Sequence, residues 1–366
     1  MFGKMGLTTG VKSIHIGTLR WKERTVMDSR DRQYSTEVLP GIFKISLPIS
    51  GKQPGPVNAY LFQGDPLTLL DTGMKTHAGR LRLALEELGY SFSEIRQIVI
   101  THGHVDHYGS AKTVRDEGGA VVLAHAEEIP YISTTTTRSA YRKNARFLAI
   151  IGVPVHLRLS FRLMRHFFYR MADCCPVDRA LAAGDRVRLG SYEGMVIETP
   201  GHSKGSICLY LEKERALFSG DHILKHVTPN AFIMFEDEYV MPRRSSQREY
   251  YESLAAVEKL NPVIVFTAHG KNIDNLAETT GMYRRCFEER QRAILGIMRE
   301  GKRDVYSIAR RLFPEIGGKR RILDIYLAVS EVYTHLQVLE SGGMVRREKK
   351  GRRLFFEIGP PPACLP

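Results

Sequence analysis

Four metal-binding side chains fall within six residues of this chain, in the segment 102–107 with the sequence HGHVDH. The segment follows the apolar run QIVI at 97–100, which is typical of a short buried strand. Neutral imidazoles and carboxylates are ligands that zinc and similar divalent ions accept, and a tight loop after a strand can direct several of them to one point. A histidine-rich surface loop is the alternative, but it leaves this spacing unexplained. The segment therefore predicts a metal site.

Three further metal-binding residues follow short apolar runs in the second half of the chain. His202 lies in TPGHSKG at 199–205, Asp221 in SGDH at 219–222, and His269 in TAHG at 267–270. Residues that repeatedly follow buried strands can meet at one rim of a sheet sandwich. The whole set is therefore arranged as a site for two metal ions requires.

Strand and helix signals alternate along the chain and predict an α/β protein. In the first half we expect helices at about 76–90 and 109–117, and strands at 38–48, 58–62, 67–71, 97–101 and 120–124. In the second half, from about residue 184, we expect a helix at 246–260 and strands at 195–199, 206–211, 216–219 and 263–267.

The ordered motifs over about residues 60–275 resemble those of the metallo-β-lactamase superfamily, whose fold is an αβ/βα sandwich with a dinuclear site between two sheets. The resemblance implies that one metal ion is bound by His102, His104 and His202, and the other by Asp106, His107 and His269. It implies that Asp221 bridges both ions. It also implies that Asp71, in LDTG at 70–73, supports the metal-binding segment 102–107 (the metal loop) without being a ligand itself. His222 is a candidate for contacting the metal ligands or the substrate. A loop histidine beside a metal site more often serves in packing.

The resemblance implies a metal-dependent hydrolase. Two divalent ions about 3.5 to 4 Å apart lower the pKa of a shared water towards about 7, which gives a hydroxide ion at neutral pH. This hydroxide is the expected nucleophile, so that no Ser or Cys nucleophile is needed. Asp106 and Asp221 are candidates for passing a proton to the leaving group. Zinc is the expected metal, and iron and manganese also suit these ligands.

Two segments depart from a minimal core of this superfamily. Residues 128–180 are predicted to form a helical cap insertion, in which arginines recur among large apolar residues. There are three interpretations of this insertion. It packs over the sandwich, or it caps the metal cleft and offers apolar surface to an acyl chain and cationic groups to an anionic one, or it contacts a membrane surface. Residues 281–360 predict three helices and a hairpin that turns at 350–351, and resemble the winged-helix domain appended to some lactamase-like hydrolases, including a group with single-strand endoribonuclease activity.

The charge of the C-terminal segment favours RNA over DNA as a nucleic-acid partner. Residues 281–366 hold 18 Lys and Arg against 10 Asp and Glu, but residues 322–345 hold no Lys or Arg. A recognition helix without cations would lie poorly against DNA phosphates, whereas the basic hairpin could follow a single strand. The other interpretation is that this C-terminal segment serves in packing or dimerisation. A homo-oligomer is therefore one of the alternatives that the sequence leaves open.

These patterns predict a disordered lead-in at 1–35, a catalytic domain at 36–280 and a winged-helix-like domain at 281–360. The expected function is hydrolysis of an ester, thioester or lactone in a small-molecule or acyl substrate. The alternatives are a single-strand endoribonuclease and a non-catalytic, metal-stabilised binding module. Asp221 stands where many true β-lactamases have Cys or Ser, which disfavours antibiotic hydrolysis. The C-terminal segment also differs from the helical glutathione-binding segment of glyoxalase II enzymes.

The composition predicts a cytoplasmic protein with no transmembrane segment. No apolar stretch is long enough to span a membrane, and the first residues, MFGKMGLTTG, lack the apolar block of a secretory signal. Met27 is an alternative start of the natural chain. The five cysteines show no C-x-x-C spacing, so that neither a disulfide framework nor a thiolate zinc site is indicated.

Overall fold

The structure is a computed structural model that describes residues 34–49, 54–134, 138–168, 170–233, 241–314 and 322–359. The predicted lead-in lies outside these ranges except for its last two residues, and so does Met27. Ser35, which the prediction placed in the lead-in, is the first residue of a strand.

The first sheet contains seven strands in the order of the sequence, β1-β2-β3-β4-β5-β6-β7. β1 to β4 pair antiparallel, whereas β4 to β7 pair parallel. Helices α1 (Ala78–Glu87) and α3 (Ala111–Gly118) lie in the connections between parallel strands. The strands span Ser35–Leu39, Ile42–Leu47, Val57–Phe62, Thr68–Leu70, Gln97–Ile100, Val121–His125 and Arg179–Leu181.

The second sheet contains five strands in the order β12-β11-β10-β9-β8. Its one parallel pair, β11 with β12, is joined through α7 (Ser246–Leu260), which ends at Asn261 in a left-handed conformation. The five strands, β8 to β12, span Arg186–Leu189, Tyr192–Glu198, Ile207–Leu211, Ala216–Phe218 and Ile264–Phe266. The predicted strands and helices of both halves are therefore present, with their ends shifted by a few residues.

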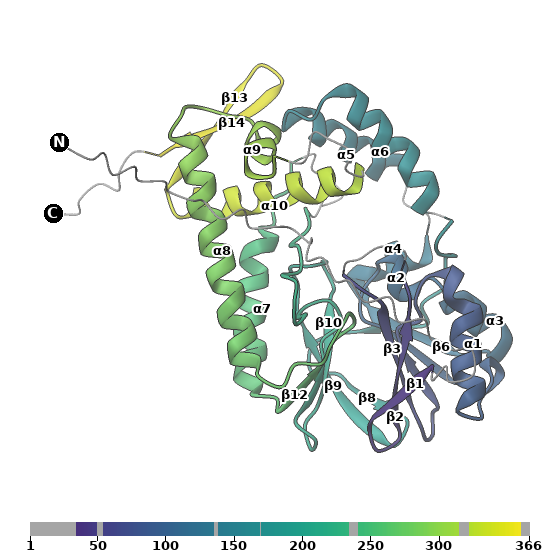
Figure 1. Ribbon diagram of the computed structural model, residues 1–366. Coiled ribbons are helices and arrows are strands. Elements are labelled where there is room, and N and C mark those ends of the chain that lie inside the picture. Colours follow the sequence, from purple (N-terminus) through teal and green to yellow (C-terminus); the bar gives the residue numbers. More distant parts are fainter. Residues whose placement is uncertain are drawn as a thin grey trace, which may run out of the picture.

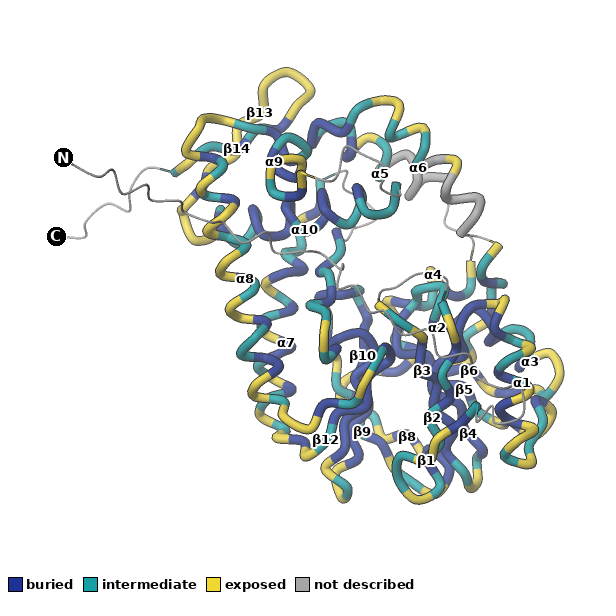
Figure 2. Tube along the Cα trace, viewed as in Figure 1, coloured by how far each residue is buried: buried dark blue, intermediate teal, exposed yellow. Residues whose placement is uncertain are grey.

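The two sheets face each other, with α1 and α3 outside the first sheet and α7 outside the second (Figure 1). β3 shows how the sequence builds these layers, because all six of its residues are buried. Successive side chains of a strand point to opposite faces. Ala59 and Leu61 accordingly join the core under the outer helices, while Tyr60 and Phe62 join the core between the sheets. Figure 2 shows the central strands of the sandwich, such as β3 and β10, buried between the outer helices, and exposed residues on the edge strands β1 and β8.

Helix α8 (Leu276–Met298) connects the sandwich to the C-terminal helices. Its first half packs against α7 through Tyr283 and Phe287, and its second half enters a separate core through Ile294 and Met298. That core also contains α9 (Val305–Leu312), α10 (Ile322–Ser341) and the hairpin β13–β14 (Val345–Lys350 and Arg353–Ile358). The predicted domain boundary at 280 thus falls inside one continuous helix. The division into domains and the winged-helix assignment stay predictions.

The insertion predicted at 128–180 contains α4 (Ile129–Ser133), α5 (Arg138–Ile150) and α6 (Val155–Phe168), but its last two residues already belong to strand β7 of the first sheet. α5 and α6 contact each other, α6 also contacts α10, and α5 also contacts β14. Phe147, Leu148 and Ile151 are buried in the C-terminal core rather than against the sheets. Two segments far apart in the sequence therefore form one apolar core. None of the described helices is long and apolar enough to cross a membrane.

Candidate metal centre

The seven predicted ligands come together where the strands of both sheets end. Their ligand atoms form two groups, and within each group these atoms lie within 4.8 Å of one another. His102, His104, His202 and Asp221 make the first group, and Asp106, His107 and His269 make the second. The loop after β5 and the short helix α2 (Val105–Tyr108) supply four of these residues, and the loops after β9, β11 and β12 supply one each.

Three imidazole nitrogens face one another in the first group. His104 Nδ1 lies 2.9 Å from His102 Nε2 and 3.1 Å from His202 Nε2. Nitrogens that share a tetrahedral zinc ion at about 2.0 to 2.1 Å lie about 3.3 Å apart, so this spacing suits a small cation. Burial and the neighbouring imidazoles, His107 foremost, hold the pKa of His102 well below its ordinary value, and burial and His104 lower the pKa of His202 to about 4. Both rings are therefore neutral at pH 7, which is the state that binds a metal ion.

Two histidines of the second group, and Asp221 of the first, have buried polar atoms without a hydrogen-bond partner. Among the described residues, His107 Nε2, His269 Nε2 and Asp221 Oδ1 are buried without one. Asp221 Oδ1 lies 3.4 Å from His269 Nε2, and Asp221 Oδ2 lies 3.6 Å from His107 Nε2 and 3.5 Å from His202 Nε2. Buried polar atoms are nearly always paired, so a bound cation is the partner that these atoms fit. Asp221 reaches both groups, and the residues fit two divalent ions.

Electrostatics keep Asp221 in its charged form. Burial opposes the charge, but His269 and His107 hold the pKa of Asp221 well below its ordinary value. Burial also opposes the charge of His107, yet Asp221, Asp71 and Asp106 raise the pKa of His107 well above its ordinary value. These carboxylates favour a positive charge at this place, and a metal ion bound there would displace the proton of His107. An anionic Asp221 is the state that can contact two cations at once.

Asp71 lies behind the metal loop, at the place that the sequence predicted. It is 1% exposed, and its Oδ2 lies 2.8 Å from His107 Nδ1. The backbone N–H of Thr101 donates to Asp71 Oδ1, and the Thr101 hydroxyl donates to Asp71 Oδ2, both at 2.8 Å. Asp71 therefore fixes the end of β5 and leaves the other nitrogen of His107 directed at the ligand group.

His222 lies outside both ligand groups. Its ring packs 4.9 Å from the ring of Tyr250, whose hydroxyl donates to the backbone carbonyl of His222. Burial and His202 lower the pKa of His222 to about 3. These contacts favour packing, the commoner of the two roles considered for this residue.

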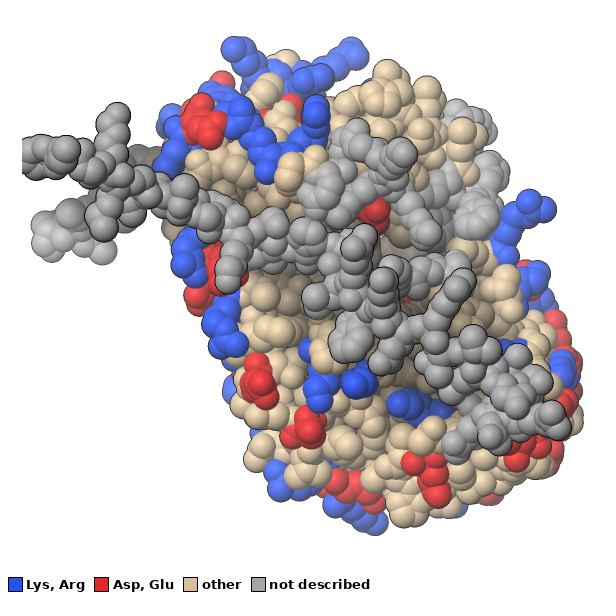
Figure 3. All heavy atoms as spheres, in the orientation of Figure 1, with Lys and Arg blue, Asp and Glu red and all other residues tan. Residues whose placement is uncertain are grey.

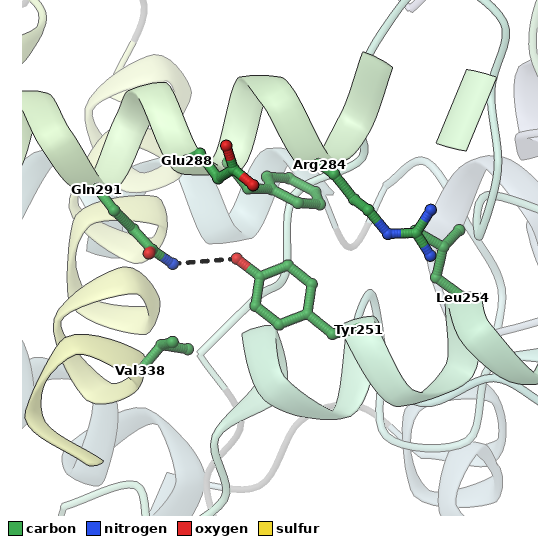
Figure 4. Close-up of a pocket in the computed structure, with 7 residues that line it drawn as sticks. Tyr251, Leu254, Arg284, Glu288, Gln291 and Val338 are labelled. Atoms are coloured by element: carbon green, nitrogen blue, oxygen red, sulfur yellow. Dashed lines mark hydrogen bonds between the residues drawn. The ribbon is translucent and has the colours of Figure 1, made fainter. Parts of the chain in front are cut away.

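A surface hollow between α7, α8 and α10 contains none of the predicted ligands (Figure 4). It is lined partly by Tyr251, whose hydroxyl accepts a 3.1 Å hydrogen bond from Gln291.

Glu128 is a buried residue of the site that the sequence did not reveal. Its Oε2 accepts from the N–H of Gly103, between His102 and His104, at 2.7 Å. Its Oε1 accepts from the N–H of Gly205, three residues after His202, at 2.6 Å. A single carboxylate thus holds together the two loops that supply the nitrogens of the first group.

Glu128→Gln is expected to weaken binding of the first metal ion by about 10-fold, because a residue that orients ligands typically contributes 10- to 100-fold. The amide can accept from only one of the two glycine N–H groups and leaves the other unpaired, which should also lower the free energy of unfolding by about 1 to 3 kcal/mol. Competition with a coloured chelator and a urea titration measure the two effects. Glu127→Gln is the matched control, since that side chain is 49% exposed. Equal metal affinities in both variants would refute the role of Glu128.

Residues 53–269 match the family model described as the metallo-beta-lactamase superfamily. The chain belongs to the metallo-beta-lactamase superfamily. In this family, relatives are named as metallo-hydrolases, and the chain is accordingly a metal-dependent hydrolase that binds divalent metal ions. The resemblance expected from the motifs is confirmed at this level.

The superfamily relatives include proteins of similar length. The probable metallo-hydrolase YqjP of Bacillus subtilis is 28% identical over 310 residues, which cover 83% of this chain and 93% of that protein. A beta-lactamase-like protein 2 homolog of Caenorhabditis elegans is 28% identical over 258 residues, or 69% of this chain and 70% of that protein. A hydroxyacylglutathione hydrolase of Cereibacter sphaeroides is 31% identical over 147 residues, or 40% of each chain.

A solved structure of a superfamily protein extends the similarity beyond the matched segment. A metallo-beta-lactamase family protein from Thermus thermophilus is 25% identical, with a TM-score of 0.74 over 88% of this chain and the whole of that chain. The family model covers a smaller part of the chain, from 53 to 269. The shared fold therefore includes segments outside the metal-binding sandwich.

Proposed function

We propose that this chain hydrolyses an ester, a thioester or a lactone with two divalent ions, zinc by preference and iron or manganese as alternatives. In this proposal His102, His104 and His202 hold one ion, Asp106, His107 and His269 hold the other, and Asp221 contacts both. The observation that carries the proposal is the pair of ligand groups that meet at Asp221, with buried atoms of three residues left unpaired.

When bound, two such ions lower the pKa of a coordinated water and withdraw electrons from a substrate carbonyl. The two carboxylates of the site differ in their suitability for proton transfer. The side chain of Asp106 is 25% exposed, whereas that of Asp221 is 10% exposed and its pKa is held well below its ordinary value. Asp106 is therefore the better candidate for passing a proton to the leaving group, and Asp221 serves as the shared anionic ligand.

RNA cleavage is the alternative, and the basic hairpin is the observation that favours it. Lys and Arg side chains gather at the β13–β14 hairpin (Figure 3), and Lys349, Lys350 and Arg352 are exposed there. Other hairpin cations are already paired with carboxylates: Arg346 lies 2.6 Å from Glu357. These pairs reduce the charge available to phosphates, and a carbonyl substrate remains the first proposal.

The proposed function is tested by hydrolysis of matched substrates by protein loaded with zinc and shown to hold two ions per chain. The panel contains a thioester, an aryl ester and a lactone, with a fluorogenic single-stranded RNA beside them. We expect turnover of at least one carbonyl substrate and its loss after chelation. Cleavage of RNA alone would replace the proposal by its alternative, and turnover of neither class would favour a non-catalytic binding module.

A further inference from the structure

The segment that follows Asp221, residues 222–233, is here called the strap. It passes alongside the first ligand group, where the backbone carbonyl oxygen of Asn230 lies 2.9 Å from His202 Nδ1. This contact leaves the other ring nitrogen of His202 directed at His104. The backbone of the strap therefore orients His202, one of the proposed ligands. The strap also begins directly after Asp221, another proposed ligand.

Two helices, α8 and α10, form hydrogen bonds with the strap. On α8, the hydroxyl oxygen of Tyr283 accepts from the N–H of Leu224 at 2.7 Å and lies 3.0 Å from the carbonyl oxygen of Val227. At the far end, the N–H of Ile233 donates to the hydroxyl of Ser330 on α10 at 2.9 Å. The side chain of Ile233 is 6% exposed and belongs to the C-terminal core. The position of the strap thus depends on the C-terminal helices.

Phe232 is the strap residue that faces the ligand group. The centre of its ring lies 5.1 Å from that of His104 and 5.2 Å from that of His202, with interplanar angles of 77° and 75°. Its neighbours Ala231 and Ile233 are buried, whereas Phe232 is partly exposed. The ring of Phe232 remains in contact with water beside a reactive centre. An apolar part of a ligand that covers this ring removes apolar surface from water, which favours binding.

We propose that Phe232 forms the wall of a binding subsite for an apolar acyl or aryl group of the substrate, and that Ser330 positions this wall through Ile233. This inference rests on the proposed function and narrows its substrate class to esters, thioesters or lactones with an alkyl or aromatic group next to the reacting carbonyl. In this arrangement the C-terminal helices take part in substrate selection through the strap, without contacting the substrate.

Binding of carboxylates to metal-loaded protein tests the subsite without any turnover. Acetate and octanoate present the same carboxylate and differ in their apolar chain. Phe232→Ala is expected to weaken octanoate binding by about 10-fold or more and to change acetate binding by less than about 2-fold, since even one methylene in an apolar pocket changes recognition by 10-fold or more. Phe232→Leu should restore most of the octanoate affinity. Phe355→Ala, at a partly exposed phenylalanine of the hairpin, is the matched control.

The positioning role of Ser330 has its own measurement. Ser330→Ala is expected to raise KM for a long-chain acyl ester several-fold while kcat and the number of bound ions stay unchanged. Equal loss of acetate and octanoate binding in Phe232→Ala would overturn the subsite and make this residue a packing residue. A preserved octanoate preference in protein that hydrolyses no carbonyl substrate would instead support the subsite and refute the proposed function. The two failures are therefore distinguishable.

Discussion

Asp221→Asn is expected to lower kcat/KM for the carbonyl substrate by about 1000-fold or more. Asp221 lies 3.5 Å from His202 Nε2 and 3.4 Å from His269 Nε2, so it contacts both ligand groups. Removing the shared negative charge weakens metal binding in both groups. A loss of about 4 kcal/mol in transition-state stabilisation, within the several kcal/mol that metal ions supply, corresponds to roughly three powers of ten in rate. Steady-state kinetics and metal analysis of the same samples measure the effect.

Asp116→Asn is the control for this charge change, because Asp116 is an exposed residue that pairs with Lys112 on the surface of α3. We expect this control to keep two ions per chain and full activity. An Asp221→Asn protein that behaves like the control would remove Asp221 from the proposed ligand set.

Asp71→Ala is expected to cost both stability and metal affinity. The substitution removes the carboxylate next to the buried imidazole of His107 and the acceptor of two hydrogen bonds from Thr101. Breaking a buried charged pair from one side typically costs about 3 to 5 kcal/mol. Loss of a residue that orients a metal ligand typically lowers metal affinity or activity by 10- to 100-fold. Chemical denaturation and competition with a chelator measure these two effects separately.

Asp71→Asn separates the charge from the backbone conformation. Asp71 has a φ of +57°, in the left-handed region that asparagine tolerates far better than alanine does. The amide oxygen can still accept from the Thr101 N–H, so we expect a smaller loss of stability than in Asp71→Ala, with a clear loss of metal affinity. Unchanged metal affinity in both variants would show that Asp71 only stabilises the turn.

The sequence alone predicted most of the strands and the candidate ligands because both depend on local signals, whereas the short strands β7 and β8 were not predicted. Each ligand follows a short apolar run, and such runs formed the strands β5, β9, β11 and β12, of which β9 is only partly buried. Helix α7 was predicted at 246–260 and lies at Ser246–Leu260. Helix α8 begins at Leu276, five residues before the C-terminal segment predicted from 281, although the side chain of Asn275 caps it by accepting from the N–H of Glu278.

Contacts across long separations could not be predicted in the same way. Glu128 is one of two adjacent acidic residues, and no pattern separates it from its exposed neighbour. Its partners are backbone N–H groups that lie 25 residues earlier and 77 residues later in the chain. Phe232 likewise lies in a segment without periodicity, and its contact with His104 joins segments that follow strands of different sheets. Such roles depend on the folded arrangement and leave no local signal.

The shared core of α5 and the C-terminal helices has a consequence for how this chain is made. Ile151 emerges from a ribosome 143 residues before Ile294, its partner in that core. At 5 to 20 residues per second, this interval lasts roughly 7 to 30 s. Throughout that time Phe147, Leu148 and Ile151 lack the core that later buries them, although the first sheet can already pair. The nascent chain therefore presents the apolar C-terminal turn of α5 to the cell for seconds, which makes this turn the segment where chaperone binding is expected during synthesis.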